Sequence, residues 1–164
     1  MQTSPAWQRR SAVGLGTFAA LTAGAATLGA RSTDGGTQRW YRRLKKPPFQ
    51  PPAAAFPIAW TALYGLIALS GWRVWRKPSG AARSLALELW GVQLGLNAAW
   101  SWLFFGKRRK RTALADLGLL WVSIAGYTAA ARRVDRPAAR MMVPYLGWVA
   151  FAGVLNAEIV RRNP

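Results

Sequence analysis

The sequence contains no histidine and no cysteine, and it has only 5 Asp and Glu residues against 23 Lys and Arg. Without cysteine the chain can form no disulfide bond. Without imidazole and thiolate it also lacks the side chains that most often bind iron in proteins. Its apolar segments offer no nucleophile, no base with a partner and no metal site. We therefore predict neither catalytic nor metal-binding residues, which favours a binding protein over an enzyme.

The chain is instead rich in apolar residues, which form five long runs. These runs cover approximately residues 12–30, 53–75, 85–105, 112–131 and 141–160. Each contains about 20 residues, which is the length that a helix needs to cross a hydrocarbon layer ~30 Å thick. The pattern predicts an all-α fold, a five-helix transmembrane bundle, with residues 1–164 forming a single membrane domain. The connections are too short for a second soluble domain.

The positive charges lie between the apolar runs. The densest group, 107–111, directly follows Phe104 and Phe105, where the third predicted helix leaves the bilayer. A soluble nucleic-acid-binding protein is the alternative explanation of such a group, but attraction to anionic lipid headgroups explains it with fewer assumptions. We therefore predict membrane lipids, and no nucleic acid, as partners. Asp116, about one turn into the fourth run, is interpreted as a structural partner of these cations.

The first run, 12–30, has two interpretations. Arg9 and Arg10, followed by a mildly apolar segment rich in Gly, Ala and Thr, resemble a secretory or twin-arginine signal peptide with small residues at a cleavage site. Small residues suit equally well a helix that packs closely against its neighbours in a membrane bundle. The residues of this run alone leave both interpretations open.

Gln93, Asn97 and Trp100 form a polar stripe inside the third run. Residues three and four apart share one face of a helix, so these side chains point in one direction. A polar side chain at membrane depth is costly unless it meets a partner, a cavity or a ligand. We therefore expect the functional site along this stripe.

Two other runs carry stripes of similar character. Trp60 and Tyr64 share a face of the second run, and Trp148, Ala152 and Asn156 follow one another at intervals of four in the fifth. Such a stripe is either a contact between helices or the wall of a pocket. Small residues favour close helix approach, whereas Trp beside Asn suits a flat apolar ligand with a few polar groups.

The segment 31–52 is predicted to be a Pro-rich loop, because four of the six residues 47–52 are proline. Trp40, Tyr41 and Phe49 lie in this segment among several cations. Such a mixture is typical of an aromatic belt at the headgroup level, which the spacing alone favours. An ordered lid over the end of the bundle is the alternative.

Five motifs occur in order over residues 40–156. They are WYxxLxKP from Trp40, the pair Pro51-Pro52, FxxxWTxLY from Phe56, QLxLNxxWxxxFFG from Gln93 and PYxxWxxFAxxLN from Pro144. This succession resembles the TspO/MBR family of tryptophan-rich sensory proteins and translocator proteins, also called peripheral benzodiazepine receptors. The resemblance implies a five-helix membrane bundle, commonly a homodimer, with a cavity open toward the first connection and the first run retained as a helix.

The resemblance further implies binding, transport or sensing of porphyrins, such as protoporphyrin IX and haem, or of related flat hydrophobic molecules. The ligand-binding residues implied for this chain are Tyr41, Trp60, Tyr64, Gln93, Asn97, Trp100, Trp148, Ala152 and Asn156. Tyr41 and the Pro-rich segment would close the Trp-lined cavity. Because His and Cys are absent, a tetrapyrrole would be held by stacking on indole rings rather than by a bond to its metal. No resident cofactor is predicted.

Two alternative functions are compatible with the same residues. Light- or oxygen-dependent degradation of a porphyrin needs no nucleophile or base, so the lack of catalytic groups does not exclude it. A sterol- or lipid-binding regulatory membrane protein is the second alternative. The family's cholesterol-recognition pattern is interrupted here, however, because no Tyr lies between Asn156 and Arg161. In each case we expect a multi-pass integral protein of a bacterial cell membrane.

Overall fold

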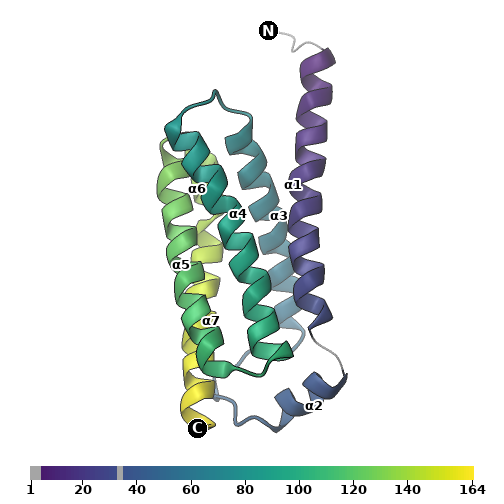
Figure 1. Ribbon diagram of the computed structural model, residues 1–164, viewed down its shortest axis with the longest axis vertical. Helices are drawn as coiled ribbons and strands as arrows, with labels where there is room; N and C mark the ends of the chain where they lie inside the picture. Colours follow the sequence, from purple (N-terminus) through teal and green to yellow (C-terminus); the bar gives the residue numbers. More distant parts are fainter. Residues whose placement is uncertain (1–4, 33–34) are drawn as a thin grey trace.

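In a computed structural model, which describes residues 5–32 and 35–164, the chain folds into long helices that lie side by side (Figure 1). Five of these helices have 20 residues or more: α1 (Pro5–Arg31), α3 (Ala55–Trp75), α4 (Ala81–Ser101), α5 (Lys110–Arg132) and α7 (Val143–Arg162). Two short helices, α2 (Gly35–Arg43) and α6 (Arg136–Met141), and a π-helical turn, η1 (Trp102–Gly106), accompany them. The described residues contain no β-strand, so the predicted all-α fold is confirmed.

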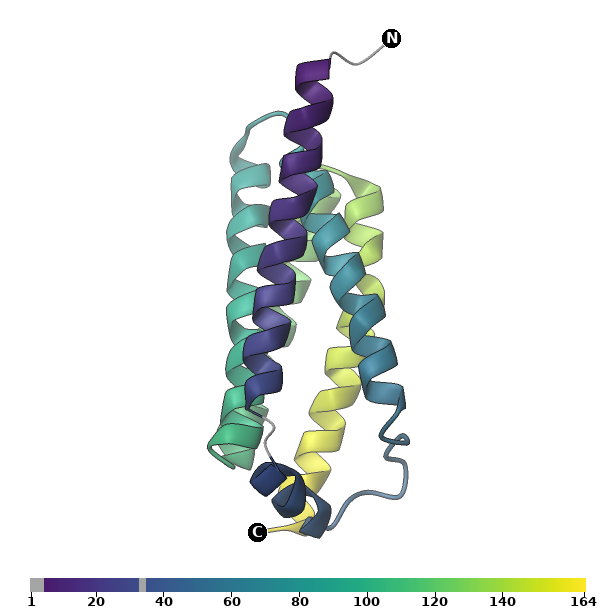
Figure 2. The same cartoon turned by 90° about the vertical axis from the view of Figure 1, so that its right-hand side faces the viewer.

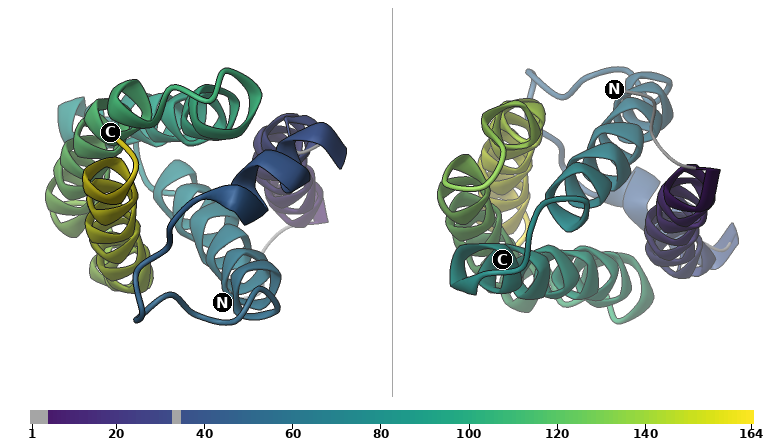
Figure 3. Two further views of the ribbon diagram at one scale, coloured as in Figure 1. Left: turned by 90° about the horizontal axis from the view of Figure 1, so that it is seen from below. Right: turned by 90° about the horizontal axis from the view of Figure 1, so that it is seen from above.

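The connections between the long helices gather at the two ends of the bundle (Figures 1 and 2). The start of α1, the α3–α4 connection and α6 lie at one end, which we call the α6 end. The short helix α2, the turn η1 and the C-terminus lie at the other, which we call the α2 end. Viewed along the bundle, α2 lies across that end (Figure 3).

Four helical segments of the described chain are long and apolar enough to cross a membrane. They are Ala6–Arg31, Ala55–Trp75, Lys110–Arg132 and Arg136–Arg162. The predicted count of five crossings is therefore not confirmed. The difference lies in α4, which has 21 residues but carries Glu88, Gln93 and Asn97 within its length. With these polar side chains, no stretch of 18 residues in α4 is apolar enough to count as a candidate span.

The segment 31–52 contains more regular structure than the predicted Pro-rich loop. Helix α2 occupies Gly35–Arg43, and the irregular backbone begins only a few residues before Pro47. The prolines restrict their own positions and the residue before each of them. They have no effect on the preceding turns, where Trp40 and Tyr41 are helical.

Helix α1 packs against α3 and α4 through a close contact between large and small residues. The ring of Phe18 meets the ring of Trp90 edge to face, with centroids 4.6 Å apart. The indole nitrogen of Trp90 donates to the carbonyl of Ile67 at 2.9 Å. A Cβ atom at Gly71 would lie only 2.5 Å from that nitrogen, so the absence of a side chain at Gly71 permits this packing.

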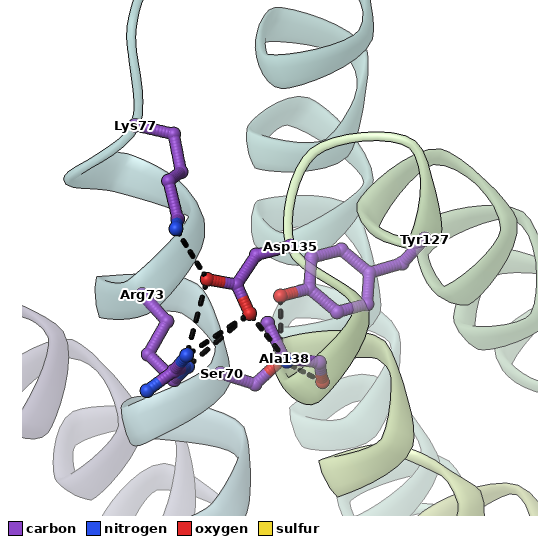
Figure 4. A network of polar contacts seen from close by, with 6 residues as sticks. All are labelled: Ser70, Arg73, Lys77, Tyr127, Asp135 and Ala138. Atoms are coloured by element: carbon purple, nitrogen blue, oxygen red, sulfur yellow. Dashed lines mark hydrogen bonds and ion pairs between the residues drawn. The ribbon is translucent and has the colours of Figure 1, made fainter.

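At the α6 end, the buried carboxylate of Asp135 joins α3 to α6 (Figure 4). It accepts a hydrogen bond from the backbone N–H of Ala138 at 2.9 Å and so caps the first turn of α6. It also forms ion pairs with Arg73 at 3.2 Å and Lys77 at 2.9 Å. Burial raises the pKa of Asp135, but the hydrogen bonds from Ala138, Lys77 and Arg73 outweigh it, so the pKa lies below its usual value.

Two hydroxyl groups extend this network into the bundle (Figure 4). The Ser70 hydroxyl donates to the carbonyl of Ala138 at 2.8 Å and lies 2.7 Å from the Tyr127 hydroxyl. Since the Ser70 proton is already engaged, the Tyr127 hydroxyl must be the donor in their contact. These contacts fix α3, α5 and α6 to one another at this end.

Helices α3 and α7 diverge toward the α2 end (Figure 2). Aromatic side chains occupy the region between them. This part of the bundle contains most of the residues that the sequence predicted as a ligand site.

Candidate functional site

Asn97 of α4 links three helices through its side-chain amide. Its oxygen accepts a hydrogen bond from the Tyr64 hydroxyl of α3 at 2.8 Å, and its nitrogen donates to the Tyr145 hydroxyl of α7 at 3.0 Å. Asn97 is 3% exposed and Tyr145 is fully buried. The polar group expected at membrane depth thus has protein partners on both of its atoms, and it holds the walls of the site together.

Aromatic rings from α3 and α7 meet beside this link. Trp60 stacks on Tyr64 with ring centroids 5.2 Å apart, and it contacts Trp148 edge to face at 6.4 Å. Trp148 also contacts Phe56 at 5.8 Å. The structure therefore brings together the predicted stripes of the second and fifth apolar runs, with their rings in mutual contact.

Gln93 and Trp100 lie on α4, one turn to either side of Asn97, and each has a buried atom without a partner. The Gln93 nitrogen donates to the carbonyl of Trp90 at 3.0 Å, whereas its oxygen accepts no hydrogen bond. The Trp100 indole nitrogen likewise has no acceptor. The predicted stripe of α4 thus faces inward. Its three side chains differ in how many of their hydrogen-bonding atoms have a partner in the protein.

At the α2 end, Tyr41 and Trp100 pack on the same two phenylalanines. Trp100 stacks on Phe104 with centroids 5.5 Å apart, and Tyr41 meets Phe104 at 6.1 Å and Phe105 at 5.6 Å. Burial raises the pKa of the Tyr41 phenol, and a contact with the side chain of Gln50 works in the opposite direction. Since Trp100 also packs on the main core, it joins the covering helix α2 to the interior.

Ala152 and Asn156 complete the predicted stripe of α7. Ala152 is half-buried and packs on the main core. The Asn156 nitrogen donates to the carbonyl of Lys110 at 2.9 Å and so ties α7 to the start of α5. The Asn156 oxygen is buried and has no partner.

Five buried side-chain atoms in the described part of the chain lack a hydrogen-bond partner. Three of them belong to predicted site residues, and the full set is Gln50 Oε1, Gln93 Oε1, Trp100 Nε1, Asp116 Oδ2 and Asn156 Oδ1. A buried polar atom without a partner costs about 1–3 kcal/mol. Three of the five atoms thus lie in side chains of the predicted site, where their hydrogen-bonding capacity is not used by the protein.

Sequence reasoning missed two residues of this region. Tyr145 lies three residues before Trp148 on the same face of α7, a spacing that could have identified it. Asp116 was interpreted as a partner of the cations at 107–111, but no ion pair involves Asp116 among the described residues, where the acids in ion pairs are Asp135 and Glu158. Its carboxylate is buried inside the bundle instead.

Two cavities of about 350 and 360 Å³ lie away from this aromatic region. One is at the α6 end between α5, α6 and α7, and the other lies between α1 and α3. In the described ranges, no group of three or more acidic side chains is placed to hold a metal ion. The geometry of the aromatic region suits the binding of an apolar molecule with a few polar groups.

Comparison with known proteins gives consistent matches along the chain. The TspO/MBR family model matches residues 18–162. A translocator protein from Bos taurus is 41% identical over 139 residues, which cover 83% of this chain and 82% of that protein. Protein CrtK from Rhodobacter capsulatus is 38% identical over 152 residues, 90% of this chain and 92% of its own. A tryptophan-rich sensory protein from Cereibacter sphaeroides is 38% identical over 141 residues, 84% and 87% respectively.

Proposed function

The chain belongs to the TspO/MBR family and is a membrane protein, and we propose that it binds a porphyrin or a similar flat hydrophobic molecule for transport or sensing. The proposed site lies between α3, α4 and α7, with α2 as its cover. The aromatic rings of Trp60, Trp100 and Trp148 supply stacking surfaces from these three helices. Because Trp60 and Trp148 are in contact, a ligand must separate them to enter.

The observation that carries this proposal is the set of unpartnered polar atoms among aromatic rings. Gln93 Oε1 and Asn156 Oδ1 can accept hydrogen bonds, and Trp100 Nε1 can donate one. Protoporphyrin IX and haem both carry carboxyl groups at one edge. A carboxyl oxygen can accept from Trp100 Nε1, and a protonated carboxyl group can donate to Gln93 Oε1 or Asn156 Oδ1, while the flat body of the ligand stacks on the indoles.

Titration of the purified protein with protoporphyrin IX and with haem, read by tryptophan fluorescence quenching, tests the proposal. We expect comparable affinities for both, because the chain offers neither His nor Cys to the iron. Gln93→Leu should weaken binding by roughly fivefold, the value of one hydrogen bond of about 1 kcal/mol. A strong preference for haem would contradict stacking as the basis of binding.

Trp121→Phe is the matched control for Trp100→Phe in this titration. Trp121 is 43% exposed on α5, whereas the Trp100 ring packs on Phe104 inside the bundle. We expect Trp100→Phe to weaken porphyrin binding and Trp121→Phe to leave it unchanged. Equal effects of the two variants would place the ligand on the outer surface instead.

The same samples distinguish carriage from degradation. Absorption spectra of the bound porphyrin, recorded in light and in darkness, remain unchanged if the protein only binds and carries it. Loss of the Soret band only in light, and only with Trp100 and Trp148 intact, would instead establish photochemical degradation.

We further propose that α4 is a fifth membrane crossing. If it crosses, the α3–α4 connection and the η1–α5 connection lie on opposite sides of the membrane. Because the chain has no cysteine, single variants Ser79→Cys and Lys107→Cys can be labelled in sealed vesicles with a reagent that does not cross the bilayer. Labelling of both from the same side would contradict a fifth crossing.

The outer face of α4 offers a contact surface for the predicted homodimer. Gly91 and Gly95 are exposed, and a Cβ atom at either would meet nothing within 4 Å. Glycines four residues apart allow membrane helices to approach closely. We therefore propose that two copies of the chain pack through this face.

A further inference from the structure

The cavity at the α6 end is a groove of about 350 Å³ with three arginines along it. Arg132 is the last residue of α5, and Arg136 and Arg140 lie one turn apart on α6. Ala139 and Val143, together with Thr128, form the rest of the lining. The groove therefore combines three cations with a largely apolar wall.

Among the described residues, no acidic side chain lines this groove to neutralise the arginines. The nearest acid in sequence, Asp135, is turned toward Arg73 and Lys77, and its side chain is only 2% exposed (Figure 4). Arg132, Arg136 and Arg140 are all exposed. Guanidinium groups that share one groove repel one another unless an anion lies between them.

The apolar wall offers an incoming molecule little polar contact. The Thr128 hydroxyl already donates to the carbonyl of Ile124 at 2.8 Å. Ala139 is buried, and Val143 is 57% exposed at the start of α7. A ligand that satisfies the whole groove has an anionic group with several acceptor oxygens and an apolar extension beside it.

The groove lies where two membrane-spanning segments meet the headgroup region. One span ends at Arg132 and the next begins at Arg136. At this depth the molecule that combines a phosphate with an apolar chain is a phospholipid, and arginine pairs with phosphate through two parallel hydrogen bonds. We propose that this groove binds the headgroup of an anionic phospholipid through Arg132, Arg136 and Arg140, with an acyl chain against Val143.

The second cavity repeats this combination on another side of the bundle. It has a volume of about 360 Å³, and its lining includes Arg9, Arg10 and the ring of Trp75. In the part of the chain that the structure describes, no acidic side chain lines it either. The repetition agrees with an α6 end that faces an anionic leaflet, although the proposal rests on the α5–α6 groove alone.

Native mass spectrometry of the delipidated full-length protein, titrated with dioleoylphosphatidylglycerol or dioleoylphosphatidylcholine, tests the proposal. We expect the wild type to prefer phosphatidylglycerol. Each cation near an anionic headgroup contributes about a fivefold gain in affinity, so replacing all three arginines by Gln should reduce that binding roughly a hundredfold. Binding of phosphatidylcholine, whose choline cation offsets the charge of its phosphate, should fall much less.

A charge-matched control separates the groove from general electrostatic attraction. Arg42→Gln, Arg109→Gln and Arg111→Gln together remove three exposed cations at the α2 end. We expect this triple variant to retain the preference for phosphatidylglycerol. Equal losses in both triple variants would overturn the proposal, because they would show that total charge alone determines binding.

A third variant tests the shape of the groove without changing its charge. Val143→Trp fills the apolar part and should weaken phosphatidylglycerol binding several-fold; unchanged binding would overturn the proposed position of the acyl chain. It also keeps the proposal testable if the triple arginine variant fails to fold.

A competition experiment distinguishes a lipid headgroup from free phosphate. Inorganic phosphate, added in excess, should not displace the lipid. Full displacement would identify the groove as a site for free phosphate instead.

Discussion

Asn97→Leu removes the single side chain that links α3, α4 and α7 inside the site. The variant leaves the Tyr145 hydroxyl without its donor at 3.0 Å and the Tyr64 hydroxyl without its acceptor at 2.8 Å. The orphaned Tyr145 hydroxyl is fully buried, so it costs about 1–3 kcal/mol. The Tyr64 hydroxyl is only partly buried and costs less, and hydrogen bonds between membrane helices average about 0.6 kcal/mol. We expect a total destabilisation of about 2 kcal/mol.

A double-mutant cycle isolates the contact with Tyr145. Tyr145→Phe alone leaves the Asn97 nitrogen without an acceptor, whereas in the double variant Leu faces Phe and neither group is orphaned. The two changes should therefore be less than additive, with a coupling free energy of about 1 kcal/mol. Unfolding by sodium dodecyl sulfate in mixed micelles, followed by far-ultraviolet circular dichroism, provides the free energies.

Val122→Leu is the control, because Val122 is 64% exposed on α5, away from the site and from the proposed dimer face. It should change the free energy of unfolding by less than about 0.5 kcal/mol. Additive effects of Asn97→Leu and Tyr145→Phe, within about 0.3 kcal/mol, would refute the assigned link. Porphyrin titration of Asn97→Leu adds a functional measurement. The Asn97 amide is already paired within the protein, but without it α3, α4 and α7 are less firmly held together, so the affinity for porphyrin should fall.

Three further predictions follow from other contacts. Gly71→Ala should destabilise the protein by about 1–3 kcal/mol in the same unfolding assay, because its Cβ would lie 2.5 Å from Trp90. Gly65→Ala, with open space around it, should be neutral or stabilising. The pKa of Asp135 is lowered in the folded protein. The ionised carboxylate therefore stabilises the fold fully at pH values above about 4, the ordinary pKa of an aspartate, and this stabilisation is lost as the pH falls toward the lowered pKa. The thermal midpoint of Asp135→Asn should show a smaller drop over that range than the wild type does; equal slopes would contradict the ion-pair assignment. Gly95→Leu should convert a dimer to a monomer in size-exclusion chromatography with light scattering, and an unchanged mass would exclude the proposed α4 face.

The sequence predicts the long helices well because their apolar runs match the thickness of a bilayer and are bounded by charges. It also predicts the inward stripe of α4, since Gln93 and Asn97 differ strongly from the residues around them. It does not predict that Asn97 pairs with Tyr145 while Gln93 keeps an unpartnered oxygen. That difference depends on which side chain of a distant helix lies opposite each amide, and periodicity along one helix contains no such information.

The ion pairs of the aspartates could not be predicted from the sequence for the same reason. Asp116 and Asp135 each lie near cations in sequence, and proximity along the chain favours an ion pair for both. Asp135 pairs with Arg73 and Lys77 from another helix, whereas Asp116 points into the bundle, away from the neighbouring basic group. A helical turn carries residues five or six apart to different faces, so a nearby cation in sequence is often out of reach.

The proposed membrane insertion of α4 depends on which face of the helix its polar residues occupy. Mean hydropathy counts Gln93 and Asn97 against insertion, yet they are 0% and 3% exposed in the folded bundle. The outward face of α4 carries Leu85 and Val92, both about half exposed, and Arg83 lies at the α6 end, where it donates to the carbonyl of Trp75. The cost of a polar side chain in a membrane falls when it faces the bundle interior. Gln93 and Asn97, which lower the hydropathy of α4, are therefore also residues of the proposed site, and the proposed insertion of α4 and the assembly of the site both depend on burying these two amides inside the bundle.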